Sequence, residues 1–165
     1  MNNNTDLTNS IYHKILIHKQ LQISINYIGK FLKNTIQEYI ENEIDGKCIN
    51  EGFVKPKSVK IISYSSGLLN SFNVLYDVVF ECLICCPVEG QIINCKIQNI
   101  TESAGIKAVI DDSPSPLIIY LARDHHNNIQ EFNKLNINDN IKVYVIGQRY
   151  ELNDKYVSVI AELII

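Results

Sequence analysis

Residues 74–88 read VLYDVVFECLICCPV, and every second residue from Val74 to Val88 is apolar. This period is typical of a β-strand with one buried face. At about 3.3 Å per residue the stretch would span roughly 45 Å, more than a single small sheet uses. Pro87 cannot donate a hydrogen bond to a central ladder. We therefore predict a strand that bends, or passes from one domain into another, near Pro87 and joins two halves of the chain.

Composition indicates a soluble globular protein of one domain or two small ones. The 165 residues are 46% hydrophobic and 20% charged, with a net charge of -3. Residues 1–87 hold eight Lys and eight acidic residues, whereas residues 88–165 hold seven Lys or Arg and ten acidic residues. Such a chain does not attract nucleic acid through its overall charge.

Neither a secretion signal nor a membrane span is expected. Residues 1–10 are polar and are predicted to form a disordered tail. The odd number of five cysteines in a chain without such a signal indicates reduced thiols inside a cell.

The first half combines strand and helix patterns. Residues 11–25 alternate in a way that suits one or two strands. Residues 28–44 carry apolar side chains at steps of three and four, which predicts an amphipathic helix with Asn26 as its N-cap and Gly46 as its stop. Residues 46–69 indicate short strands separated by turns.

The second half carries five strand patterns, with a short helical segment between the third and fourth. That layout is typical of an OB-fold barrel. We predict an α+β N-terminal domain at 11–87, a small antiparallel sheet plus one helix, and an all-β five-stranded OB-fold barrel at 88–165. The five patterns fall at residues 90–100, 106–110, 117–121, 141–146 and 156–165.

Two groups of residues resemble a metal site and a catalytic site, but neither has the arrangement that such a site needs. On a strand, Cys82 and Cys86 face one way and Cys85 the other, so they are expected to be buried thiols and not metal ligands. His125 and His126 lack a marked nucleophile or orienting carboxylate, so a loop pair that forms hydrogen bonds or touches a ligand is favoured. We expect no catalytic residues, no metal and no cofactor.

A nucleic-acid surface on the barrel is the alternative to a plain barrel face. OB-folds stack bases on aromatic side chains and follow the backbone with cations. The second and third predicted barrel strands offer one aromatic and a few cations in an acidic half, so binding to RNA is expected to be weak. The candidate residues are Lys107, Tyr120, Arg123 and His125.

Several local motifs occur in the order seen in one protein family. The chain resembles the stalk subunit of multisubunit DNA-dependent RNA polymerases, which is the seventh subunit of the eukaryotic enzyme and the archaeal E-prime subunit. Its composition and pattern are similar to homologues of large cytoplasmic DNA viruses. It departs from the family at residues 82–90 and in the linker 55–72. The matching motifs are EIDGKC at 43–48, EGFV at 51–54, VVF at 78–80, PVEG at 87–90 and IGQR at 146–149.

The resemblance implies a non-catalytic subunit with an N-terminal tip domain and a C-terminal OB-fold. The tip would dock on the large polymerase subunits near the clamp during initiation, and the OB-fold would touch nascent RNA weakly through the four residues named above. A small stalk partner subunit accompanies the cellular enzymes. Such a protein would be intracellular, in the host cytoplasm and the virion if viral and in the nucleus otherwise. Docking is placed on Gly52, Phe53, Gly67, Leu68 and Leu69, because apolar residues on turns outside a core need a partner surface, and the domain junction on Pro87, Val88, Glu89 and Gly90.

Two other functions stay open. One is a free-standing single-stranded nucleic-acid-binding OB-fold protein, which tight and salt-dependent RNA binding would favour. The other is an enzyme of unknown class, which requires a turnover that depends on His125 or His126.

Overall fold

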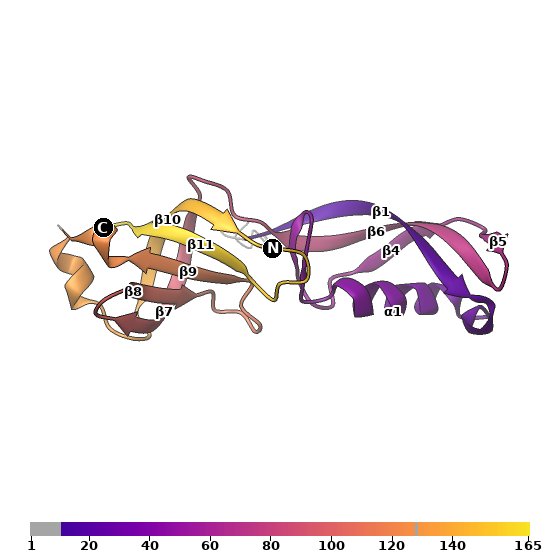
Figure 1. Cartoon of the computed structure of the whole chain (residues 1–165), viewed down its shortest axis with the longest axis horizontal. Coiled ribbons are helices and arrows are strands. Elements are labelled where there is room, and N and C mark those ends of the chain that lie inside the picture. Colours follow the sequence, from indigo (N-terminus) through magenta and orange to yellow (C-terminus); the bar gives the residue numbers. More distant parts are fainter. Residues whose placement is uncertain (1–10, 128) are drawn as a thin grey trace, which may run out of the picture.

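The computed structural model describes residues 11–127 and 129–165. The molecule is elongated, with a closed five-stranded barrel at one end and a six-stranded sheet flanked by an α-helix at the other (Figure 1). We call the second part the sheet region. Among the described residues, no helix has the length and apolar character needed to cross a bilayer.

The long apolar stretch forms β6 (Asn73–Cys85) only as far as Cys85, and the predicted continuation of the strand to Val88 is wrong. The whole of β6 belongs to the sheet region. It is paired over its whole length with the equally long antiparallel β1 (Tyr12–Ser24). Three short strands pair one after another with successive parts of its other edge. A single sheet therefore accommodates a strand of this length, contrary to the expectation from the sequence. The three short strands are β5 (Leu68–Asn70), β4 (Lys60–Tyr64) and β3 (Gly52–Val54), and β3 also pairs with β2 (Cys48–Ile49).

The helix of the sheet region is α1 (Leu32–Ile44), which buries Ile36, Ile40 and Ile44 at the predicted spacing. It starts later than predicted, because Asn26 lies inside the 3-10 turn η1 (Ile25–Tyr27) and Phe31 occupies the N-cap. Gly46 follows the last turn with a φ of +64°, which confirms it as the stop.

The barrel is built from the five strands predicted, in the order β7–β8–β9–β11–β10 and closing on β7. β9 and β11 run parallel, and the other neighbours are antiparallel. Two 3-10 helices, η2 (Arg123–His126) and η3 (Gln130–Lys134), lie between β9 and β10. This arrangement is consistent with an OB-like barrel. The strands are β7 (Ile92–Thr101), β8 (Gly105–Val109), β9 (Leu117–Ala122), β10 (Asn140–Arg149) and β11 (Val157–Leu163).

Two apolar cores meet at the end of β6. Ile84 packs in the core of the sheet region, whereas the next residue, Cys85, packs in the barrel core. The same division separates Val54 from Phe53 on β3, and Phe53 is fully buried among barrel residues. Successive side chains on a strand point to opposite faces. On β3 and at the end of β6, one face therefore packs in the barrel core and the other in the core of the sheet region.

Hydrogen bonds also connect the two parts of the molecule. The backbone N–H of Cys48 donates to the carbonyl oxygen of Asp154 at 2.8 Å, and the N–H of Asn153 donates to the carbonyl oxygen of Cys48 at 2.9 Å. The hydroxyl of Tyr150 donates to the carbonyl oxygen of Asn50 at 2.8 Å. The turn between β10 and β11 is thus fixed on β2.

Candidate docking surface

The end of the molecule farthest from the barrel is a β-hairpin made by β5 and the start of β6 (Figure 1). Asn70 pairs with Asn73, which leaves Ser71 and Phe72 as a two-residue turn, with Ser71 at a φ of +57°. The backbone N–H of Ile25 donates to the carbonyl oxygen of Phe72 at 3.0 Å. This bond fixes η1 beside the hairpin.

Large apolar side chains are exposed at this end. Phe72 is 83% exposed, and Tyr27 and both leucines of β5 are each more than two-thirds exposed. Monomeric soluble proteins rarely leave such a group of side chains in water, and exposed apolar patches mark interaction sites. We call this surface the hairpin end and define it as Tyr27, Leu68, Leu69 and Phe72.

The two leucines of the hairpin end point to opposite faces. Leu69 is paired with Val74 and Leu68 with Leu75, and successive side chains on a strand alternate between faces. Val74 lies on the face of β6 that carries the buried Tyr76, and it packs against the core of the sheet region. A partner that covers both leucines must therefore contact both sides of the hairpin.

The other residues predicted to dock have structural roles. A Cβ atom on Gly67, which has a φ of +89°, would lie 2.7 Å from Cγ1 of Val74. A Cβ atom on Gly52, which has a φ of +137°, would lie 2.6 Å from the carbonyl oxygen of Cys85. Both positions therefore require glycine. The reasoning applied to Phe53 was wrong, because its side chain is inside a core and not on the surface.

The sequence did not single out Tyr27 and Phe72, and it placed Phe31 on the apolar face of the helix predicted at residues 28–44. That placement is wrong, because Phe31 precedes α1 as its N-cap and is 68% exposed. The positions of Tyr27 and Phe72 offered one clue. Each is a large aromatic residue in a short segment next to a predicted strand: Tyr27 follows the pattern at 11–25, and Phe72 precedes the pattern at 74–88. Tyr27 and Phe72 lie outside the periodic segments, so the spacing of apolar residues assigns them to no face and does not reveal that they are exposed.

The predicted RNA-binding residues are only partly brought together. Lys107 on β8 is paired with Tyr120 on β9, which is paired in turn with Ile160 on β11. Tyr120 and Ile160 are both exposed, so a cation, an aromatic ring and an apolar side chain form one row across the barrel. A shallow cavity of about 230 Å³ adjoins Lys107 and Tyr120.

Arg123 and His125 lie on η2, beyond the end of that row. Nη1 of Arg123 donates to Oδ1 of Asn133 at 3.1 Å, and the guanidinium group lies 5.7 Å from the centre of the Phe132 ring. Arg123 is therefore engaged with η3, whereas His125 is exposed.

His126 has a structural role in the loop that follows β9. It is buried and stacked on Phe132 with ring centres 4.6 Å apart. Its Nε2 accepts a hydrogen bond from the backbone N–H of Leu163 at 3.0 Å, so Nδ1 carries the proton and donates to the carbonyl oxygen of Ala122 at 2.6 Å. This confirms the predicted hydrogen bonding for one member of the histidine pair.

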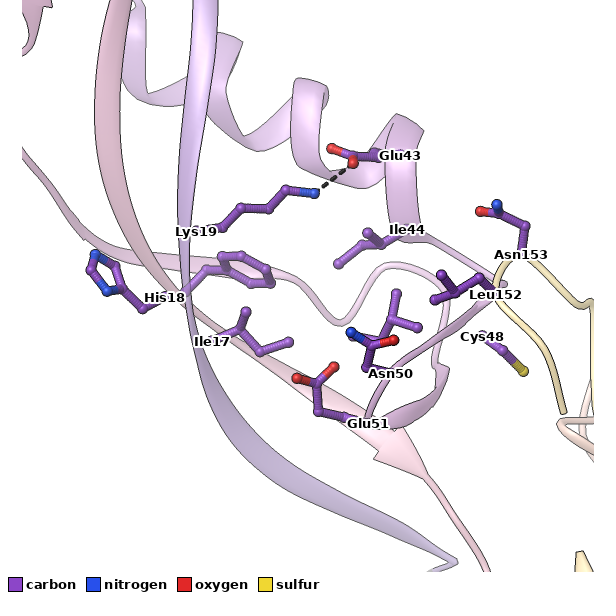
Figure 2. Close-up of a pocket in the computed structure, with 12 residues that line it drawn as sticks. Ile17, His18, Lys19, Glu43, Ile44, Cys48, Asn50, Glu51, Leu152 and Asn153 are labelled. Atoms are coloured by element: carbon purple, nitrogen blue, oxygen red, sulfur yellow. Dashed lines mark hydrogen bonds and ion pairs between the residues drawn. The ribbon is translucent and has the colours of Figure 1, made fainter. Parts of the chain in front are cut away.

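A cavity of about 330 Å³ lies where the sheet region meets the barrel. Figure 2 shows Lys19 of β1 paired with Glu43 near the end of α1, while Leu152 and Asn153 of the barrel line another side. Within residues 11–127 and 129–165, no group of three His, Cys, Asp or Glu side chains is placed to hold a metal ion.

The predicted junction, Pro87 to Gly90, makes a tight connection between the parts. Pro87 is buried, and the backbone N–H of Val88 donates to Oε1 of Gln91 at 3.2 Å. Gly90 has a φ of +89°, and its N–H donates to the carbonyl oxygen of Val145 on β10 at 2.9 Å. The connection thus enters the barrel with its backbone already bonded to β10.

Four cysteines are buried and act as packing groups. Burial raises the pKa of the Cys82 thiol to about 11 and the pKa values of Cys48, Cys85 and Cys95 to about 12 each. Cys82 packs in the core of the sheet region and Cys85 in the barrel core. The thiol is thus the stable form in both cores.

These features define a class of two-part β-protein, in which an OB-like barrel is joined to a sheet region with an exposed apolar hairpin. No protein-family model matches the chain. The sequence is similar to a protein of Acanthamoeba polyphaga mimivirus with the provisional name DNA-directed RNA polymerase subunit L376. The two are 26% identical over 177 aligned residues, which cover 94% of this chain and 83% of the mimivirus protein.

Proposed function

We propose that this protein is a non-catalytic subunit of a DNA-directed RNA polymerase of a large DNA virus and that it occupies the stalk position. The similarity to the mimivirus protein, which extends over nearly the whole chain, carries this proposal. The OB-like barrel and the elongated form support the stalk position, because a stalk subunit has to bridge the polymerase and the emerging transcript. The protein would act in the host cytoplasm and be packaged in the virion.

The hairpin end is the surface that we assign to docking on the large polymerase subunits. Leu68 and Leu69 are exposed on opposite faces of one narrow hairpin, with Phe72 at its turn. A flat partner surface would cover only one face. A pocket that receives the hairpin would cover both, so we infer that the hairpin inserts into a pocket of the partner.

The contribution of these side chains to docking can be estimated from their exposure. Burying a Leu or Phe side chain contributes about 1.5–3 kcal/mol. Because Leu68, Leu69 and Phe72 are two-thirds or more exposed, together they could contribute roughly 4–6 kcal/mol, or about 10³–10⁴-fold in affinity.

The experiment is recovery of the polymerase with the tagged full-length protein. The triple variant Leu68→Ala, Leu69→Ala, Phe72→Ala should lose the large polymerase subunits while its thermal unfolding stays close to that of the wild type. Leu16→Ala is the matched control, because Leu16 is 67% exposed but lies along β1 and outside the hairpin end. Absence of the large subunits from the wild-type preparation would refute the polymerase assignment. Undiminished recovery with the triple variant would refute the docking surface.

We place contact with nascent RNA on the row formed by Lys107, Tyr120 and Ile160. A base can stack on the tyrosine ring while Lys107 approaches a phosphate. The excess of acidic residues after Pro87 disfavours tight binding by the protein alone. RNA contact would therefore depend on the polymerase holding the transcript beside the barrel.

A further inference from the structure

A groove adjoins the hairpin end, and most of the residues that line it carry a polar group. It has a volume of about 490 Å³ and lies between the end of β1 and the exposed side of α1. Tyr27 belongs both to this groove and to the hairpin end, and Asn73 of the groove follows Phe72 directly in the chain. A partner that covers the hairpin end is therefore next to the groove.

The charge of the groove comes from one carboxylate. Among the lining residues that the structure describes, Glu38 is the only one with a charged side chain, and none is Lys, Arg or His. Within the described ranges 11–127 and 129–165, Glu38 forms no ion pair and no side-chain hydrogen bond, whereas Glu43 on the same helix is paired with Lys19. The carboxylate of Glu38 is therefore available to a ligand.

The remaining lining supplies groups that suit a cation. Tyr27 and Tyr39 provide two aromatic rings, both exposed, and ring faces attract cationic side chains. Gln22, Asn42 and Asn73 add side-chain carbonyl oxygens that can accept hydrogen bonds. A phosphate or a carboxylate would meet the negative charge of Glu38 and no cation, so an anionic ligand is disfavoured.

We propose that this groove binds an arginine or lysine side chain of the protein on which the hairpin end docks. Arginine fits best, because its planar guanidinium can lie on a tyrosine ring while it donates two hydrogen bonds to one carboxylate. The identity of the partner rests on the proposed function, but the chemistry of the groove does not. The cation would fix the orientation of the protein after the apolar hairpin has inserted.

The first test measures the affinity of full-length variants for polymerase that lacks this subunit. Glu38→Gln keeps the shape of the side chain and removes its charge, and we expect it to weaken binding by about 10–100-fold, as for the loss of one charge-assisted hydrogen bond. The wild type should also lose more affinity with added salt than Glu38→Gln does. Glu41→Gln is the matched control, because it removes the same charge from α1 outside the groove. Wild-type affinity for Glu38→Gln would overturn the proposal.

The second test needs no polymerase, so it tests the groove independently of the proposed function. Nuclear magnetic resonance spectra of the full-length protein are recorded with N-acetyl-arginine amide and with its neutral isostere, N-acetyl-citrulline amide. We expect the arginine derivative to shift signals of Tyr27 and Tyr39 with an affinity in the millimolar range, and the citrulline derivative and the Glu38→Gln variant to give no shift.

Arginine-dependent shifts in a protein that fails to bind polymerase would leave the groove supported and the proposed function refuted. If the protein binds polymerase, either a wild-type affinity of Glu38→Gln or the absence of an arginine-dependent shift would refute the groove and leave the proposed function intact.

Discussion

Phe53 is the side chain whose removal should separate the two parts of the molecule. It is carried by β3 of the sheet region, but it is fully buried in the barrel core. Phe53→Ala removes a large side chain from a fully packed site, which costs about 3–5 kcal/mol. For a chain of this size we expect the melting temperature to fall by on the order of 10 °C.

Amide hydrogen exchange shows which part of the molecule opens in Phe53→Ala. The amides of Cys48 and Asn153 are bonded across the junction, so both should exchange faster in Phe53→Ala as the junction opens locally. Val54→Ala is the matched control, because Val54 is the next residue and is equally buried, but in the core of the sheet region. It should accelerate exchange in α1 and leave Asn153 protected.

Two outcomes would contradict this account of the junction. One is a destabilised Phe53→Ala protein in which Cys48 and Asn153 exchange at the wild-type rate. The other is acceleration of both amides by Val54→Ala to the same extent. A flexible insertion after Glu89 provides a further comparison. The hydrogen bonds at Cys48 should keep the two parts coupled in that variant.

Two further predictions concern the barrel. Tyr120→Ala should reduce crosslinking of the nascent transcript to this subunit in assembled polymerase, because a stacking ring is lost. Tyr144→Ala removes an exposed tyrosine on β10 and should leave crosslinking unchanged. Crosslinking of Tyr120→Ala at the wild-type level would contradict RNA contact at Lys107, Tyr120 and Ile160. The free energy of unfolding should also fall as the pH rises above about 9. Burial raises the pKa of the Cys95 thiol from 9.0 to about 12. Between these values the unfolded state binds fewer protons than the folded state, so higher pH favours unfolding. Urea midpoints at about pH 8 and about pH 10 should differ less in Cys95→Ala than in the wild type, and an unchanged difference would refute this linkage.

The sequence determined the local structure of much of the chain. Alternation specified a long strand with one buried face, which the structure shows as far as Cys85, and the repeat of Ile36, Ile40 and Ile44 specified the buried side of a helix. The five barrel strands were also predictable, since each carries its own period of two. These are local signals, because the period of burial within one element follows from the geometry of that element alone.

Only the tertiary structure decided which partner each element has. It matched β1 to β6 along their whole lengths, placed Phe53 and Val54 in different cores, and buried His126. It also brought Tyr27 beside the turn that carries Phe72, at the end of the molecule where Leu68 and Leu69 are exposed. Periodicity shows that a face is buried but not what buries it, and it does not show which distant segments share a surface. For that reason the sequence could suggest Leu68 and Leu69 as docking residues but could not reveal the full hairpin end or the groove at Glu38.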